Sequence, residues 1–321
     1  MAKQFLTAIF LSAVCFCPSC AFYTAKSEPG NAKNQSNSNN AQDSKNYLEP
    51  RRLATIQDDA INESSGIVAS RTNPDVFWTH NDSGDGAFLY AFDKAGKKLG
   101  VWKIDNAKNV DWEDIAAYTD RQTGKNYLFV GDIGNNNLTR SESVIYKIVE
   151  PKIVQSDANS SKKNPRLIEG TQKIIVSYPD ARHDAETLLV NPSNGDLYIL
   201  SKNFSGDSDI YKLAAPYEFD RKQTLKHIGQ IGVPSLTKGL LTGGDISSDG
   251  KRLIMCDYFA GYEYVLPDGA KNFDEIWKTA ADKISLGERA QGESVCYSLD
   301  GKAIYSTSEK KRSPLNEVVR K

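Results

Sequence analysis

Residues 112–118 read WEDIAAY, and four other segments repeat their pattern of small or acidic residues followed by a short apolar run. The four are SSGIVAS at 64–70, AETLLV at 185–190, GGDISS at 243–248 and GESVCY at 292–297. Each is followed by a turn rich in Gly, Pro, Asn or Asp and then by a more apolar segment. Short, evenly spaced segments of this kind predict β-strands, and the internal repeat favours a propeller over a sandwich or a barrel.

The number of repeats predicts an all-β, five-bladed propeller. A third strand follows in every repeat, and a fourth follows in the first four. The fifth repeat ends after a third strand at 315–319, and we expect residues 52–56 to supply its missing fourth strand and close the ring. A six-bladed ring is the alternative, because the interval between Glu113 and Glu186 is long. We ascribe the excess to a polar insert around 155–164.

Composition limits the function classes. The 321 residues carry 40 Lys and Arg against 41 Asp and Glu, a formal net charge of −1, so no basic excess is available for binding nucleic acid. The hydrophobic fraction of 39% is that of a folded globular protein. The one apolar run near membrane length lies at the N-terminus, which excludes a polytopic membrane protein.

The N-terminus has the pattern of an export signal. Lys3 precedes an apolar run over 5–16, and small residues around Cys20 fit a cleavage site. We predict a signal peptide over 1–21, a disordered tether rich in Asn, Ser and Gln over 22–50, and the propeller over 51–321. The protein is then secreted or periplasmic. An uncleaved anchor and lipid attachment at Cys20 are alternatives, so the N-terminus is the one membrane tether we expect.

Two cysteines remain in the predicted propeller, Cys256 and Cys296, and each falls in a predicted strand. Buried free thiols and a disulfide bridge are both open, since an oxidising compartment permits a bridge without requiring one.

The first strands of the blades carry the strongest chemical signal, because in a propeller they line the central channel. Aligned two positions before the central apolar residue stand Ser65, Glu113, Glu186, Gly244 and Glu293. Alternate residues of a strand share a face, so three carboxylates converge on the axis. Their mutual repulsion requires protons or a cation, and oxygen ligands suit Ca²⁺. We predict a central calcium ion, with a water-filled acidic channel as the alternative.

This column and the blade architecture resemble the calcium-activated apyrases, a family of secreted, five-bladed soluble nucleotidases. The resemblance implies that Ser65, Glu113, Glu186 and Glu293 hold the calcium ion. The fourth position departs from the family, since Gly244 has no side chain. Asp245, a carbonyl group or a water molecule would replace the missing ligand. The nucleotide-contacting residues of the family are not matched here.

Longer strings resemble a group of uncharacterised exported bacterial propellers described as esterase-like or phytase-like. They are ESSGI at 63–67, HNDSG at 80–84, VDWEDIA at 110–116 and GDIGNN at 131–136. This resemblance implies export and a hydrolase. Residues 81–86 (NDSGDG) also resemble a calcium loop, for which a plain Asp-Gly turn is the alternative.

Loops at the ends of the second strands are expected to deliver polar residues to the mouth of the channel. Imidazole titrates near neutral pH, and carboxylates also transfer protons. The catalytic candidates are His80, Asp82, Asp132 and His183, and the substrate-binding candidates are Arg182, Lys202 and Asp257. The sequence contains no GxSxG, GxxxxGK[ST] or HExxH motif, so serine-hydrolase, P-loop and zinc-protease functions lack support.

Two functions therefore remain open. The first is a calcium-dependent hydrolase of a phosphorylated or ester substrate. The second is a non-catalytic exported binding module with a structural calcium ion. Both imply a small-molecule or polymer ligand at the mouth and no nucleic acid.

Overall fold

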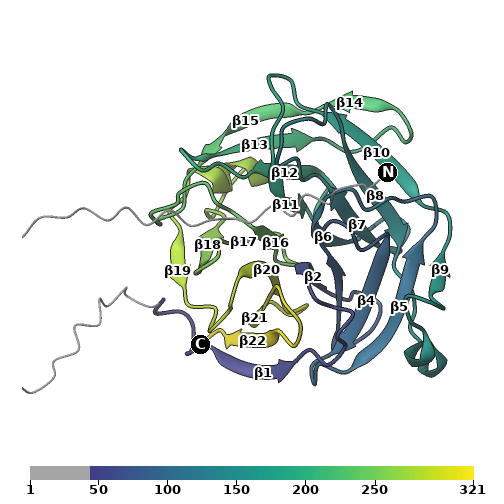
Figure 1. Ribbon diagram of the computed structural model, residues 1–321. Coiled ribbons are helices and arrows are strands. Elements are labelled where there is room, and N and C mark those ends of the chain that lie inside the picture. The colour runs from purple at the N-terminus through teal and green to yellow at the C-terminus, as the bar shows by residue number, and fades with distance from the viewer. Residues whose placement is uncertain (1–43) are drawn as a thin grey trace, which may run out of the picture. The chain divides into compact units, whose positions relative to one another are not determined.

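The computed structural model describes residues 44–321, and its strands form five sheets arranged in a ring (Figure 1). The protein is therefore a five-bladed β-propeller, as predicted, and the six-bladed alternative is wrong. The predicted signal peptide and most of the predicted tether lie outside the described residues. No helix within 44–321 has the length and apolar character needed to cross a membrane.

Each blade is a mainly antiparallel sheet whose first strand lies innermost. The first blade contains β2 (Ser64–Ala69), β3 (Val76–Asn81), β4 (Phe88–Asp93) and β5 (Lys98–Ile104). The second contains β6 (Trp112–Thr119), β7 (Asn126–Asp132), β8 (Ser143–Val149) and β10 (Gln172–Ser177). The third contains β11 (Ala185–Val190), β12 (Leu197–Ser201), β13 (Ser208–Leu213) and β15 (Lys226–Ile231). The fourth contains β16 (Gly243–Ile246), β17 (Arg252–Cys256), β18 (Gly261–Val265) and β19 (Asp282–Ile284).

The fifth blade joins the two ends of the propeller. It consists of β20 (Gly292–Tyr297), β21 (Ala303–Ser308), β22 (Pro314–Val319) and β1 (Arg51–Thr55), and β1 pairs antiparallel with β22. The predicted closing strand is thus confirmed. The last residues of the predicted tether also pack on the propeller, because Tyr47 is buried and its hydroxyl donates to Glu263 Oε1 at 2.6 Å.

The long interval before the third repeat contains the fourth strand of blade two, a short helix and one extra edge strand rather than a sixth blade. It contains the short helix η1 (Gln155–Asn159) and β9 (Arg166–Ile168), and β9 pairs in parallel with β5 of the first blade. In the same way β14 (Lys222–Thr224), which follows the third strand of blade three, pairs in parallel with β10 of blade two. The helix η2 (Phe273–Lys278) lies between β18 and β19.

Apolar side chains from neighbouring blades pack together and form the core. The Trp78 and Trp102 rings meet edge to face at 4.8 Å within the first blade, and Trp78 Nε1 donates to Glu150 Oε1 of the second at 2.8 Å. Cys256 and Cys296 are buried free thiols in β17 and β20, which supports the first of the two sequence alternatives. Burial raises the pKa of the Cys256 thiol to about 12, so this thiol stays protonated and unreactive.

We define the mouth as the end of the ring at which the inner strands begin. Below the mouth, the inner strands contact one another closely. Asp114 is buried, and its Oδ2 accepts hydrogen bonds from Leu188 N of blade three at 2.9 Å and Gly244 N of blade four at 3.3 Å. Asp245 Oδ2 accepts from Tyr297 N of blade five at 2.9 Å. A Cβ at Gly66 would lie 2.8 Å from Ile115 N, so only glycine fits there. These contacts join the inner strands below the mouth, and we use the name acidic cup for the buried glutamates Glu113, Glu186 and Glu293 at their mouth ends, together with the acidic residues beside them.

Candidate functional site

Four members of the predicted column are bulged residues. The strand register shifts across each of Ser65, Glu113, Glu186 and Glu293, in β2, β6, β11 and β20 respectively. A bulge inserts one residue that is left out of the ladder and re-aims its side chain. In contrast, β16 pairs with β17 in unbroken register through Gly244. The fourth blade therefore differs from the others in backbone geometry as well as in its missing side chain.

The three glutamates of the column share one electrostatic environment. Each is only 4–5% exposed, and Glu186 interacts with both Glu113 and Glu293. Burial, followed by repulsion from neighbouring carboxylates, raises the pKa of Glu113 well above its ordinary value. Burial raises the pKa of Glu186 to about 7 and that of Glu293 to about 8. The cup thus holds protons at neutral pH unless a cation replaces them.

Two aspartates beside this column complete a possible cation site. One carboxylate oxygen from each of Asp82, Asp111 and Glu113 lies within 4.8 Å of the others. Asp82 follows β3, whereas Asp111 immediately precedes β6. Burial and repulsion from Asp82 raise the pKa of Asp111, and burial raises that of Asp82. The site is therefore a set of destabilised carboxylates from two adjacent blades.

The donor set fits a hard divalent cation. All three ligand groups are carboxylates, which is the chemistry that Ca²⁺ prefers. A Cβ at Gly134 would clash with Glu113 Oε1 and would lie 2.6 Å from Asp111 Oδ2, so glycine leaves room for both carboxylates. Glu186 Oε2 is buried without a hydrogen-bond partner, which is costly for a carboxylate oxygen.

One ammonium group enters this cluster. Lys202, in the loop after β12, donates to Glu186 Oε1 and at 2.7 Å to the Tyr258 hydroxyl, and its side chain is 8% exposed. Burial alone would lower the pKa of Lys202, but the Glu186 carboxylate more than offsets this and raises it. Burial raises the pKa of the Tyr258 hydroxyl to about 12. Lys202 is thus a fixed positive charge on the blade-three side of the cup.

Asp184 also belongs to the cluster. It lies just before β11, is 8% exposed, and its Oδ1 accepts from Asn135 N at 2.7 Å. Its charge contributes to the raised pKa values of Glu113, Asp111 and Asp82. The sequence assigns no role to Asp111, Asp184 or Tyr258, although Asp184 and Tyr258 fall in its predicted mouth loops. Their positions in the sequence could have marked them as site candidates, because each lies directly before an inner strand or after a second strand.

The two candidate histidines contact residues outside the carboxylate cluster. His80 is fully buried, packs edge to face on Trp112, and has its pKa lowered to about 4 by burial. Its Nδ1 lies 3.1 Å from Asn81 O, and its Nε2 has no hydrogen-bond partner. His183 lies between Asp180 Oδ1 at 3.1 Å and the Tyr211 hydroxyl at 2.7 Å.

Other predicted site residues form hydrogen bonds or ion pairs with neighbouring residues. Asp132 pairs with Arg140 at 2.7 Å, while exposed Arg182 donates to Leu138 O at 3.2 Å. Asp257 accepts from two backbone amides and from the Tyr262 hydroxyl, each at 2.8 Å. Asp85, in the loop that resembles a calcium site, accepts from Asn81 Nδ2 at 2.9 Å and Tyr90 at 2.5 Å. The structure therefore brings together Glu113, Glu186, Glu293, Asp82 and Lys202 out of the larger predicted set.

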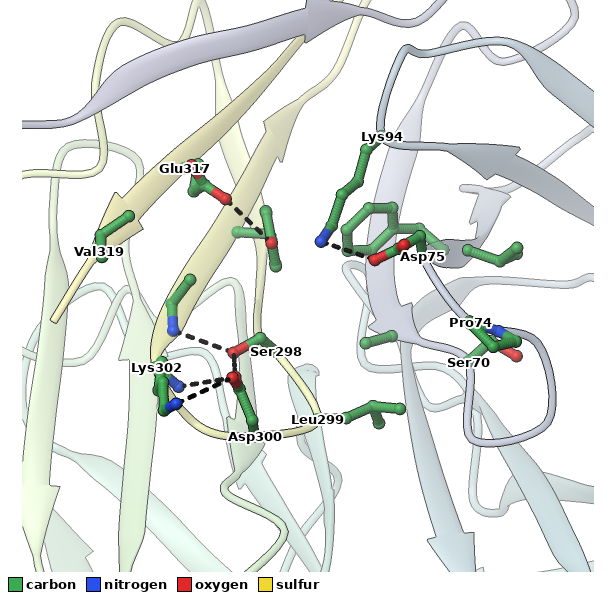
Figure 2. Close-up of a pocket in the computed structure, with 15 residues that line it drawn as sticks. Ser70, Pro74, Asp75, Lys94, Ser298, Leu299, Asp300, Lys302, Glu317 and Val319 are labelled. Atoms are coloured by element: carbon green, nitrogen blue, oxygen red, sulfur yellow. Dashed lines mark hydrogen bonds and ion pairs between the residues drawn. The ribbon is translucent and has the colours of Figure 1, made fainter.

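A separate cavity of about 410 Å³ lies between the first and fifth blades, at the end opposite the mouth (Figure 2). Its polar groups pair with one another. Lys94 contacts Asp75 at 2.7 Å, and the Tyr305 hydroxyl donates to Glu317 Oε1 at 3.0 Å. Asp300 accepts from Lys302 N at 3.0 Å in the turn that Figure 2 shows along one wall. With these groups satisfied, the cavity has the features of a gap between blades rather than of a reactive site.

Comparison with models of known protein families found no match, and comparison with curated proteins found none either. The fold class and the geometry of the cup therefore carry the functional argument.

Proposed function

We propose that this propeller is an exported, calcium-dependent hydrolase of a phosphorylated or ester substrate, with its active site in the acidic cup. The observation that carries the proposal is the convergence of Asp82, Asp111 and Glu113 within 4.8 Å. Carboxylates held this close in a partly buried site repel one another, and a bound divalent cation removes that repulsion. The resemblance of the column to calcium-activated apyrases supports the same metal and a phosphorylated substrate.

Different residues of the cup have different proposed roles. Asp82, Asp111 and Glu113 would hold the calcium ion, which would supply Lewis-acid polarisation of a substrate oxygen when bound. Lys202 offers a fixed positive charge for an anionic substrate oxygen. Glu293 is not among these three ligands, and its pKa of about 8 in the calcium-free protein suits it to the role of general acid. Glu186, with a pKa of about 7, is matched to accept a proton under the same conditions.

A binding module with a structural calcium ion is the second candidate, favoured by the position of the cluster. Asp82 comes from blade one, Asp111 and Glu113 from blade two, and Asp184 from the start of blade three. A cation bound among these groups would tie three blades together. Such a site would stabilise the ring without any turnover.

One set of measurements separates the two functions. Hydrolysis of 4-nitrophenyl phosphate, nucleotides, phytate and aryl esters is assayed with calcium and with chelator, and melting is followed in parallel. For a hydrolase we expect turnover that is lost with chelator and in Glu113→Gln, but kept in Asp249→Asn, which alters a turn at the opposite end. For a binding module we expect a lower melting temperature with chelator and no turnover. Absence of both effects would refute the calcium site.

Export is a separate part of the proposal and rests on the N-terminal sequence. The signal-peptide pattern predicts that the mature chain begins just after residue 21. Mass spectrometry of the protein recovered outside the cytoplasm tests this, and a lipid mass on Cys20 would identify the anchored alternative. An intact Met1 on protein found only in the cytoplasm would contradict export.

A further inference from the structure

The most exposed large apolar side chains of the propeller lie in loops at its mouth. Among residues 44–321 the three large apolar residues with the greatest exposure are Leu236 at 105%, Phe204 at 75% and Phe259 at 73%. They lie in three loops at the mouth, namely β12–β13, β15–β16 and β17–β18. Water-exposed aromatic rings forfeit the free energy of burial, and a patch rimmed by polar groups marks a binding surface.

The aromatic residues are continuous with the cup through Lys202. Its Nζ lies 5.9 Å from the centre of the Phe204 ring and 5.2 Å from that of Tyr258. The Tyr258 and Phe259 rings stand edge to face with their centres 6.4 Å apart. We call Phe204, Tyr258 and Phe259 the aromatic platform. Because Lys202 also pairs with Glu186, the platform borders the buried carboxylates of the cup.

Hydrogen bonds fix both loops that carry the platform. Asn203 N donates to Gly239 O at 2.8 Å, and its Nδ2 donates to Asp207 O at 3.1 Å. Asp257 Oδ1 accepts from Phe259 N and Ala260 N, each at 2.8 Å. Exposed rings on braced loops are preorganised, so a ligand that covers them loses little conformational entropy on binding.

We propose that the aromatic platform binds an aromatic or other flat apolar group of the substrate, while the cup receives its anionic group. The preferred ligand is then a small anionic ester with a ring next to its phosphate or carboxylate. The part about the anionic group rests on the proposed function, whereas the part about the ring rests on the platform alone.

Two phosphonates that cannot be hydrolysed test the proposal by calorimetry on the full chain with calcium. We expect phenylphosphonate to bind about tenfold more tightly than methylphosphonate, the upper range for one favourable ring contact. The double variant Phe204→Ala/Phe259→Ala should bind both with the affinity that wild type has for methylphosphonate. The control Leu167→Ala/Leu299→Ala removes exposed apolar side chains elsewhere and should retain the preference. Equal binding of the two phosphonates by wild type would overturn the proposal.

A neutral probe keeps this test separate from that of the proposed function. Benzyl alcohol carries a ring without an anionic group, and NMR signals of Phe204 and Phe259 report its binding. Shifts confined to the platform, with neither phosphonate bound, support the ring site and count against the anionic cup. Absence of shifts in wild type overturns the platform. Platform-dependent sedimentation with phosphatidylglycerol vesicles, or a dimer that the double variant dissociates, would replace the small ligand by a membrane or a second copy.

Discussion

The substitution Glu293→Gln tests the electrostatics of the cup most simply. The side chain keeps its size, and Gln291 Nε2, which donates to Glu293 Oε1 at 2.9 Å, keeps an acceptor. The native carboxyl has a folded-state pKa of about 8 against an ordinary value of 4.5, with burial as the main cause. Between these two values the folded state binds more protons than the unfolded state. The free energy of unfolding of the calcium-free protein therefore falls as the pH rises through this range.

The size of the effect follows from the same two pKa values. Because Glu293 ionises more readily in the unfolded chain, the free energy of unfolding lies below its low-pH value. The difference is about 1 kcal/mol at pH 5, about 3 kcal/mol at pH 7 and about 5 kcal/mol at pH 9. Glutamine does not titrate, so Glu293→Gln should stabilise the calcium-free protein by amounts that increase with pH. At about 2 °C per kcal/mol for a domain of this size, the melting temperature should rise by about 6 °C at pH 7.

The assay is thermal or urea unfolding in chelator at several pH values between 5 and 9. Glu169→Gln, on the exposed surface, is the matched control and should change nothing. Saturating calcium should reduce or reverse the difference in stability between Glu293→Gln and wild type. The reason is that a bound cation stabilises the ionised carboxylates of wild type more than the neutral amide of the variant. A gain in stability that is independent of pH, or a loss that grows with pH, would refute the reasoning.

Three further perturbations test the ring itself. Asp114→Ala should lower the free energy of unfolding by about 3 kcal/mol or more in urea, because two interior amides lose their acceptor, while Asp249→Ala in an exposed turn should have a small effect. Gly66→Ala should lower the free energy of unfolding by at least about 2 kcal/mol in the same assay, because its Cβ would meet Ile115 N at 2.8 Å. The control Gly206→Ala, whose Cβ would have only a contact at 3.5 Å, should be tolerated. Equal losses for the two variants would contradict the close packing of the inner strands. A chain that begins at residue 57 lacks β1 and should aggregate or melt without cooperativity in size-exclusion and calorimetry experiments, whereas a chain that begins at residue 44 should be monomeric and cooperative.

The fold could be predicted because its signals are local and repeated. Alternation along each strand and five similar strand openings define the blades, and the incomplete fifth repeat requires a strand from the N-terminal side. The extra edge strands β9 and β14 could not be predicted in the same way. Both are three-residue parallel pairings with a strand of the preceding blade, and their partners lie far away in the sequence.

The candidate site could be predicted only in part. The column containing Glu113, Glu186 and Glu293 follows from alignment of the inner strands, but the bulges that aim these side chains depend on pairing with the next strand. The burial of His80 against Trp112 likewise depends on contact between blades. Asp111 and Asp184 precede inner strands, where no periodic pattern distinguishes a ligand from an ordinary loop residue. The fit of these residues to calcium remains a prediction.

The central claim is that a divalent cation binds where Asp82, Asp111 and Glu113 converge. Anomalous diffraction from crystals soaked in calcium, with data collected at long wavelength, tests it directly. We expect one strong peak at about 2.4 Å from carboxylate oxygens of these three residues. Crystals with saturating calcium and no anomalous peak at this cluster would contradict the claim.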